Sequence, residues 1–184
     1  MAHAITSLRL LAVAPAAWAF SRQGSAPAWL LAVLVAVAIA SDYVDGIVAR
    51  RTGSASPAGM LFDHTTDCLF VTAGLAGAST AGLIPMILPV LAPVAFVQYV
   101  LDSYFLHRQR QLRMSSLGRW NGIFYFAPLV MIAIASLHLP LLSETARVLV
   151  RPCAVLLAVS TVASIIDRAV APLRTNAVVS DRST

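Results

Sequence analysis

Residues 29–50 read WLLAVLVAVAIASDYVDGIVAR, an apolar run that ends in two aspartates and an arginine. A helix that crosses a bilayer needs roughly 20 predominantly apolar residues. The segment therefore predicts a transmembrane helix that carries Asp42 and Asp45 near one of its ends.

The rest of the chain has the same apolar character. Of its 184 residues, 59% are hydrophobic and only 11% are charged, which lies outside the range of soluble domains. We therefore expect an all-α polytopic membrane protein with six transmembrane helices, forming a single domain over residues 1–184. The six hydrophobic segments are Ile5–Phe20, Trp29–Arg50, Gly59–Thr80, Leu83–His107, Asn121–Leu139 and Thr145–Ile166.

The first segment has a second interpretation. Arg9 precedes an apolar run, and Ala17-Trp18-Ala19 resembles a signal-peptide cleavage site. Cleavage there would leave five helices and move the carboxyl-terminal arginines outside, which weakens the charge asymmetry described next.

All thirteen basic residues are arginine, and the net charge is +5. If both termini are cytoplasmic, only Arg22, Arg147 and Arg151 lie outside, as the positive-inside rule requires. We expect the cytoplasmic (inner) membrane, contact with its lipids and no nucleic-acid partner, because the arginines flank hydrophobic segments. The inner arginines are Arg9, Arg50, Arg51, Arg108, Arg110, Arg113, Arg119, Arg168, Arg174 and Arg182.

Four of the eight acidic residues lie between positions 42 and 67. Asp42 and Asp45 are three residues apart and Asp63 and Asp67 are four apart, so each pair shares one face of a helix. An ionised carboxylate at mid-bilayer costs on the order of 3 kcal/mol, so four of them together need a reason. All-oxygen ligands suit Mg²⁺ or Mn²⁺, and the cluster therefore predicts a divalent-metal site between two helices.

Buried aspartates also have other interpretations. An ion-pair network with arginines such as Arg50 and Arg51 could be retained for packing alone. A cation transporter or channel would place aspartates inside a membrane equally naturally. Ion movement across liposomes would identify the transporter, whereas metal-dependent chemistry without permeation would identify an enzyme.

The order of residues across this region resembles a known signature. Asp42-Tyr43-Val44-Asp45-Gly46-Ile47-Val48-Ala49-Arg50 is followed after eight residues by Gly59, then by Asp63 and Asp67. This run is similar, without gap or substitution, to the signature of the CDP-alcohol phosphotransferase family. The resemblance implies six transmembrane helices with the motif at the cytoplasmic ends of the second and third.

The resemblance also implies a role for each residue of the motif. Asp42, Asp45 and Asp63 would be the principal ligands of a two-metal site, and Asp67 the general base, with possible metal contact. Room for the cytidine nucleotide would come from Gly46, Ala49 and Gly59, and Arg50 would hold its phosphates. The implied substrates are a CDP-activated lipid such as CDP-diacylglycerol and a small polar alcohol, and the implied assembly is a homodimer. An inactive scaffold that keeps the motif is a further alternative.

The acceptor alcohol is less well marked. Leu117-Gly118-Arg119 resembles a Gly-Lys pair of relatives that use phosphorylated acceptors, and Arg168 is a second candidate for an acceptor phosphate. Glycerol 3-phosphate is our first choice, with serine or an inositol phosphate as alternatives. Topology and contact with anionic lipid are another interpretation of the arginine-rich loop 107–119.

Other polar residues carry weaker signals. Thr6 and Arg9 line a nucleotide or headgroup pocket in one interpretation, and in another Arg9 is an interfacial anchor. The role of His3 stays open, and Asp102 is a candidate outer-shell acid. We expect His64 to point about 100° away from Asp63 and so to lie outside the metal site.

Overall fold

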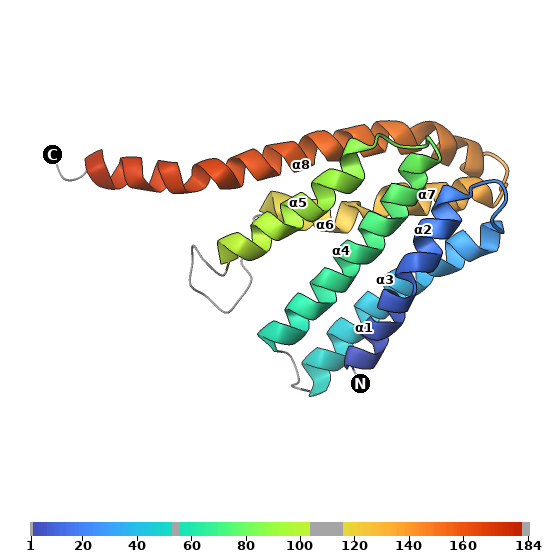
Figure 1. Ribbon diagram of the computed structural model, residues 1–184, viewed down its shortest axis with the longest axis horizontal. Helices are drawn as coiled ribbons and strands as arrows, with labels where there is room; N and C mark the ends of the chain where they lie inside the picture. The colour runs from blue at the N-terminus through green and yellow to red at the C-terminus, as the bar shows by residue number, and fades with distance from the viewer. Residues whose placement is uncertain (1, 53–55, 104–115, 182–184) are drawn as a thin grey trace.

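The computed structural model describes residues 2–52, 56–103 and 116–181, and every regular element among them is helical (Figure 1). The helices are α1 (Ala2–Leu11), α2 (Val13–Ser21), α3 (Ala28–Thr52), α4 (Pro57–Thr80), α5 (Ile87–Leu101), α6 (Ser116–Phe124), α7 (Phe126–Ser136) and α8 (Leu142–Asp181). The expected all-α class is thus confirmed.

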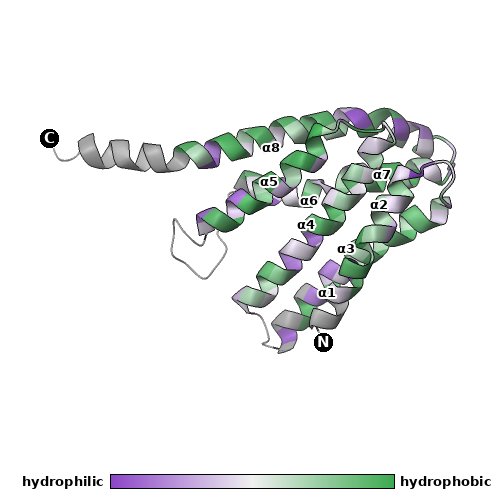
Figure 2. Cartoon of the chain, viewed as in Figure 1, coloured by the Kyte–Doolittle hydropathy of each residue, from purple (hydrophilic) through white to green (hydrophobic). Residues whose placement is uncertain are grey.

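Three helical stretches in the described part are long and apolar enough to cross a membrane. They are Ala28–Asp45, Leu117–Ser136 and Leu142–Val170, while Ile87–Leu101 is a shorter apolar helix. Figure 2 shows that hydrophobic residues dominate these helices, with hydrophilic patches on α1, α3 and α4. These apolar helices indicate an integral membrane protein. The number of six transmembrane helices remains a prediction.

Two of the expected helices are each divided in two by a proline. The first breaks at Ala12, three residues before Pro15, and the fifth at Tyr125, three residues before Pro128. A proline ring removes one backbone donor and clashes with the carbonyl group four residues earlier. Both breaks therefore lie within the turn that each proline disturbs.

Prolines also move the start of the fourth segment. We expected a helix from Leu83, but α5 begins at Ile87, after Pro85. Pro89 then lies in the first turn of α5, where backbone N–H groups have no partner within the helix, so the missing N–H of proline costs no hydrogen bond. Only Pro93 lies inside the helix. Residues 104–107 of this expected helix lie outside the described part.

The last helix is longer than expected. Helix α8 runs over Leu142–Asp181, whereas the sequence predicted Thr145–Ile166.

Helices α2 and α4 approach each other closely at Gly77. A Cβ atom at Gly77 would lie 2.4 Å from the backbone oxygen of Ala17 and 3.0 Å from the Cβ of Phe20. One turn earlier on α4, a Cβ at Gly74 would lie 3.0 Å from the side chain of Leu129, which belongs to α7. Small residues at helix interfaces allow this close packing in membranes, where lipid is as apolar as the side chains.

Hydrogen bonds fasten α8 to the other half of the bundle. The Tyr125 hydroxyl lies 2.8 Å from the Thr161 hydroxyl, and Ser160 donates to the Asn121 side-chain oxygen at 2.7 Å. The Gln98 amide of α5 donates to the backbone oxygen of Ile165 at 3.0 Å. These bonds tie α5, α6 and the turn at Tyr125 to one helix.

The start of α1, the end of α3 and the start of α4 lie at the same end of the bundle (Figure 1). Helix α1 packs against both α3 and α4. Polar side chains near these three helix ends are therefore brought together.

The Gly77 contact predicts the effect of a single added methyl group. Gly77→Ala should cost about 1–3 kcal/mol, because the new Cβ meets backbone atoms that cannot rotate away. Its midpoint of thermal unfolding in detergent should fall below that of the unsubstituted protein.

Gly122→Ala is the matched control. It also adds a methyl group to a helical glycine, but no atom lies within 4 Å of the new Cβ. Its stability should be equal or up to about 1 kcal/mol higher. Equal midpoints for the two variants would contradict the close α2–α4 contact.

Candidate active site

The four aspartates of α3 and α4 surround one guanidinium group, which belongs to Arg9 of α1. Its Nη1 atom lies 3.1 Å from Asp63 Oδ1 and 4.0 Å from Asp42 Oδ1, and it also contacts Asp67 Oδ1. Its Nη2 atom lies 4.0 Å from Asp45 Oδ2. Each of the four carboxylates thus has an oxygen atom within 4.0 Å of a guanidinium nitrogen of Arg9, and the side chains range from 5% exposed at Asp45 to 52% exposed at Asp42.

Arg9 is fully buried, with 0% of its side chain exposed. Its Nε donates to the Ser41 hydroxyl at 3.2 Å, and that hydroxyl donates to the Ala38 backbone oxygen at 3.0 Å. The interpretation of Arg9 as an interfacial anchor is therefore wrong. An interfacial arginine would extend towards water, whereas this side chain is held inside by opposite charges.

Thr6 shares this face of α1. Its hydroxyl donates to Asp45 Oδ2 at 2.9 Å, and both Thr6 and Asp45 are buried. The sequence placed Thr6 and Arg9 near a ligand pocket. The three-residue spacing of Thr6 and Arg9 indicated that both lie on one face of an apolar helix. It did not reveal that the aspartates of the motif are the groups that Thr6 and Arg9 contact.

Two buried polar atoms of the cluster have no hydrogen-bond partner among the described residues. They are Asp45 Oδ1 and Arg9 Nη2. Four carboxylates also outnumber the one guanidinium that lies among them. Oxygen donors in excess of the available positive charge suit a hard divalent cation such as Mg²⁺ or Mn²⁺, so the residues present fit the metal site that the motif implies.

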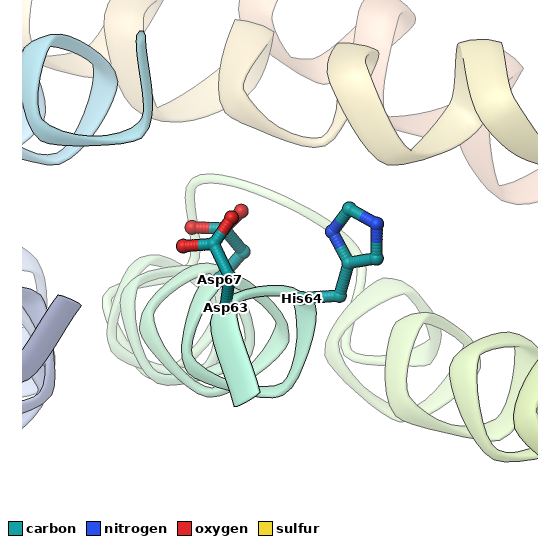
Figure 3. Close-up of side chains that lie close together, drawn as sticks. All are labelled: Asp63, His64 and Asp67. Carbon is teal, nitrogen blue, oxygen red and sulfur yellow. The ribbon is translucent and has the colours of Figure 1, made fainter. Parts of the chain in front are cut away.

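Three side chains of α4 offer a compact set of ligand atoms. One atom from each of Asp63, His64 and Asp67 lies within 4.8 Å of the other two. Figure 3 shows the two carboxylates together, with the His64 ring to one side. The His64 side chain leaves the helix in a different direction from the two carboxylates, as the 100° step between helix neighbours predicts, but one of its ring nitrogens is still close enough to serve as a ligand.

Of the residues expected to border the nucleotide, the structure describes the surroundings of Gly59 alone. Gly46, Ala49 and Arg50 lie in the last turns of α3, and their side chains are outside the described part, as is the side chain of His3. Gly59 lies in the first turn of α4, where its N–H donates to the Ser56 hydroxyl at 3.0 Å. This bond caps the helix that carries Asp63 and Asp67.

The two candidate ligands for an acceptor phosphate have different surroundings. Arg119 is exposed on α6, while the Arg168 side chain on α8 is only 10% exposed. Arg168 lies 3.6 Å from Asp102 Oδ2, and its guanidinium carbon is 5.4 Å from the centre of the Tyr99 ring. Asp102, considered as an outer-shell acid, thus contacts Arg168. The other loop arginines, Arg108, Arg110 and Arg113, lie outside the described residues.

Comparison with known proteins gives one match. A model of the CDP-alcohol phosphatidyltransferase family matches residues 1–169, a range that includes α1, the whole aspartate motif and Arg168. Neither a curated protein nor a solved structure matches the chain. The family consists of transferases that act on CDP-linked alcohols, and its match extends over most of the sequence. The chain therefore belongs to the CDP-alcohol phosphatidyltransferase family.

Proposed function

We propose that the protein transfers a phosphatidyl group from a CDP-linked lipid, such as CDP-diacylglycerol, to a small polar alcohol and releases CMP. The observation that supports this most strongly is the position of Asp42, Asp45, Asp63 and Asp67 around the buried guanidinium of Arg9. Carboxylates from two helices at one site suit a reaction in which a diphosphate must be neutralised. Family membership favours this transferase over a cation transporter.

Each aspartate has a proposed role. Asp42, Asp45 and Asp63 hold Mg²⁺ or Mn²⁺, which would neutralise the donor diphosphate and stabilise the leaving oxygen. Asp67 removes the proton of the acceptor hydroxyl. The hydroxyl oxygen then forms a bond to the lipid-linked phosphorus while the bond from that phosphorus to the oxygen of CMP breaks.

The remaining residues of the motif position the donor. Gly46, Ala49 and Gly59 leave space for the cytidine nucleotide, and Arg50 holds its phosphates. In a transfer of this type, positioning and charge stabilisation contribute most of the rate enhancement. We further propose that this end of the bundle faces the cytoplasm, where the arginines are concentrated, and that the protein forms a homodimer.

The acceptor in this proposal is a phosphorylated alcohol such as glycerol 3-phosphate. Arg168 supports it, since Asp102 and the Tyr99 ring hold its guanidinium in a defined orientation. A planar guanidinium can contact phosphate through two parallel hydrogen bonds. Arg119 on the exposed surface of α6 is the second candidate.

The reaction can be tested with purified protein, CDP-diacylglycerol, Mg²⁺ and a panel of alcohols that includes glycerol 3-phosphate, serine and an inositol phosphate. We expect CMP release and a new phospholipid, both abolished by a chelator and restored by Mg²⁺ or Mn²⁺. Full turnover in chelator-treated samples would exclude the metal site. Ion flux through liposomes without CMP release would identify a transporter.

Asp67→Asn tests the general base. Loss of proton transfer should lower CMP release by about 10²–10⁴-fold, because asparagine keeps the shape of the side chain but cannot accept the proton. Glu144→Gln is the control, since Glu144 is an exposed acid on α8 that contacts only Arg147 among the ion pairs of the described residues. Its turnover should not change. Equal activity of the two variants would rule out the role of Asp67.

Arg168→Gln tests the acceptor phosphate. Loss of a charged hydrogen bond of about 1.5–3 kcal/mol should raise the KM for glycerol 3-phosphate by roughly 10–100-fold. The KM for CDP-diacylglycerol should stay the same. Arg151→Gln, an exposed position on the same helix, is the control. If Arg119→Gln alone raises the KM, the phosphate site belongs to α6.

A further inference from the structure

The guanidinium of Arg9 lies at the place where the carboxylates meet. Nη1 contacts Oδ1 of Asp67 and lies 3.1 Å from Oδ1 of Asp63, so it bridges two carboxylates on successive turns of α4. The same atom lies 4.0 Å from Asp42 of α3. One side chain of α1 thus links both aspartate pairs.

These contacts use the oxygen atoms that a divalent cation needs. Mg²⁺ binds carboxylate oxygens at about 2.0–2.1 Å, which is closer than a guanidinium nitrogen approaches them. A cation held through Asp63 would share that carboxylate with Nη1, and two positive charges so close together repel inside a protein. Arg9 and a metal ion are therefore competitors for the same carboxylates.

Arg9 also balances part of the negative charge of the cluster. Four carboxylates with no positive charge among them would repel one another across the α3–α4 interface. Arg9 supplies that charge, and its Nε–H bond to Ser41 at 3.2 Å fixes the guanidinium from the side of α3. Asp45 Oδ1 and Arg9 Nη2 remain without hydrogen bonds among the described residues, so the guanidinium does not satisfy every polar atom of the cluster.

We propose that Arg9 is a built-in counter-cation, which holds the four aspartates together in the absence of metal and withdraws from Asp63 and Asp67 when metal binds. This inference rests on the metal site of the proposed function. Its consequence is that Arg9 sets the metal affinity: the free energy needed to displace its guanidinium is subtracted from that of metal binding.

Arg9→Met tests this directly, because methionine fills part of the space without charge. The probe is Mn²⁺ alone, and the loss of the free-ion signal in electron paramagnetic resonance measures binding to the detergent-solubilised chain. We expect Mn²⁺ to bind about tenfold more tightly than to the unsubstituted protein, a typical size for coupling between two ligands. In chelator, the same variant should unfold at a lower temperature.

Arg151→Met is the matched control, since it removes an exposed arginine of α8. Its Mn²⁺ affinity and its unfolding temperature should not change. Equal or weaker Mn²⁺ binding by Arg9→Met would overturn the inference, because a purely structural arginine would not strengthen metal binding when removed.

Ser41→Ala gives a second test that leaves every charge in place and keeps a good helix former in α3. Removal of the hydroxyl frees the guanidinium from its anchor, so Mn²⁺ should bind more tightly, by less than in Arg9→Met. Unchanged affinity would contradict the inference even if Arg9→Met fails to fold. If no Mn²⁺ binds to any of these proteins, the metal site of the proposed function fails as well, whereas equal binding by all of them overturns only the role of Arg9.

Discussion

A buried positive charge surrounded by carboxylates constrains this structure more than any other contact. Removing an ion from water costs several kcal/mol, and the cost is recovered only when opposite charges and hydrogen bonds surround it. Arg9, at 0% exposure, meets this requirement through aspartates of α3 and α4 and the hydroxyl of Ser41. Helices α1, α3 and α4 are therefore held together at the end of the bundle where the motif lies, and the reactive groups and the packing of these helices depend on the same interaction.

The rest of the bundle is held by other means. Helices α2 and α4 approach so closely at Gly77 that a side chain of any size would meet backbone. Elsewhere, hydrogen bonds that involve Gln98, Asn121 and Tyr125 attach three parts of the chain to α8. Close backbone packing and polar contacts are the usual means of helix association where lipid removes the hydrophobic advantage of packing.

Several features of the site could be predicted from the sequence because they follow from spacing along one helix. The pairs Asp42 with Asp45 and Asp63 with Asp67 each had to share a face, whatever the tertiary structure. The proline positions contained the information for the helix breaks at Ala12 and Tyr125, but hydropathy alone did not separate a broken helix from a continuous one. Arg9 was misassigned in one interpretation because a lone arginine near a helix end is compatible with both the interface and the interior.

The sequence by itself determined that this is an all-helical membrane protein, that it carries the aspartate motif of its family and that each aspartate pair lies on one helix face. These properties depend on composition and on residues within a few positions of one another. Only the tertiary structure decided that Arg9 is the cation between the pairs, that Thr6 and Ser41 hold the cluster, and that Asp102 contacts Arg168. Arg9 and Asp67 are 58 residues apart, and no local pattern specifies which charges meet when separate helices pack together.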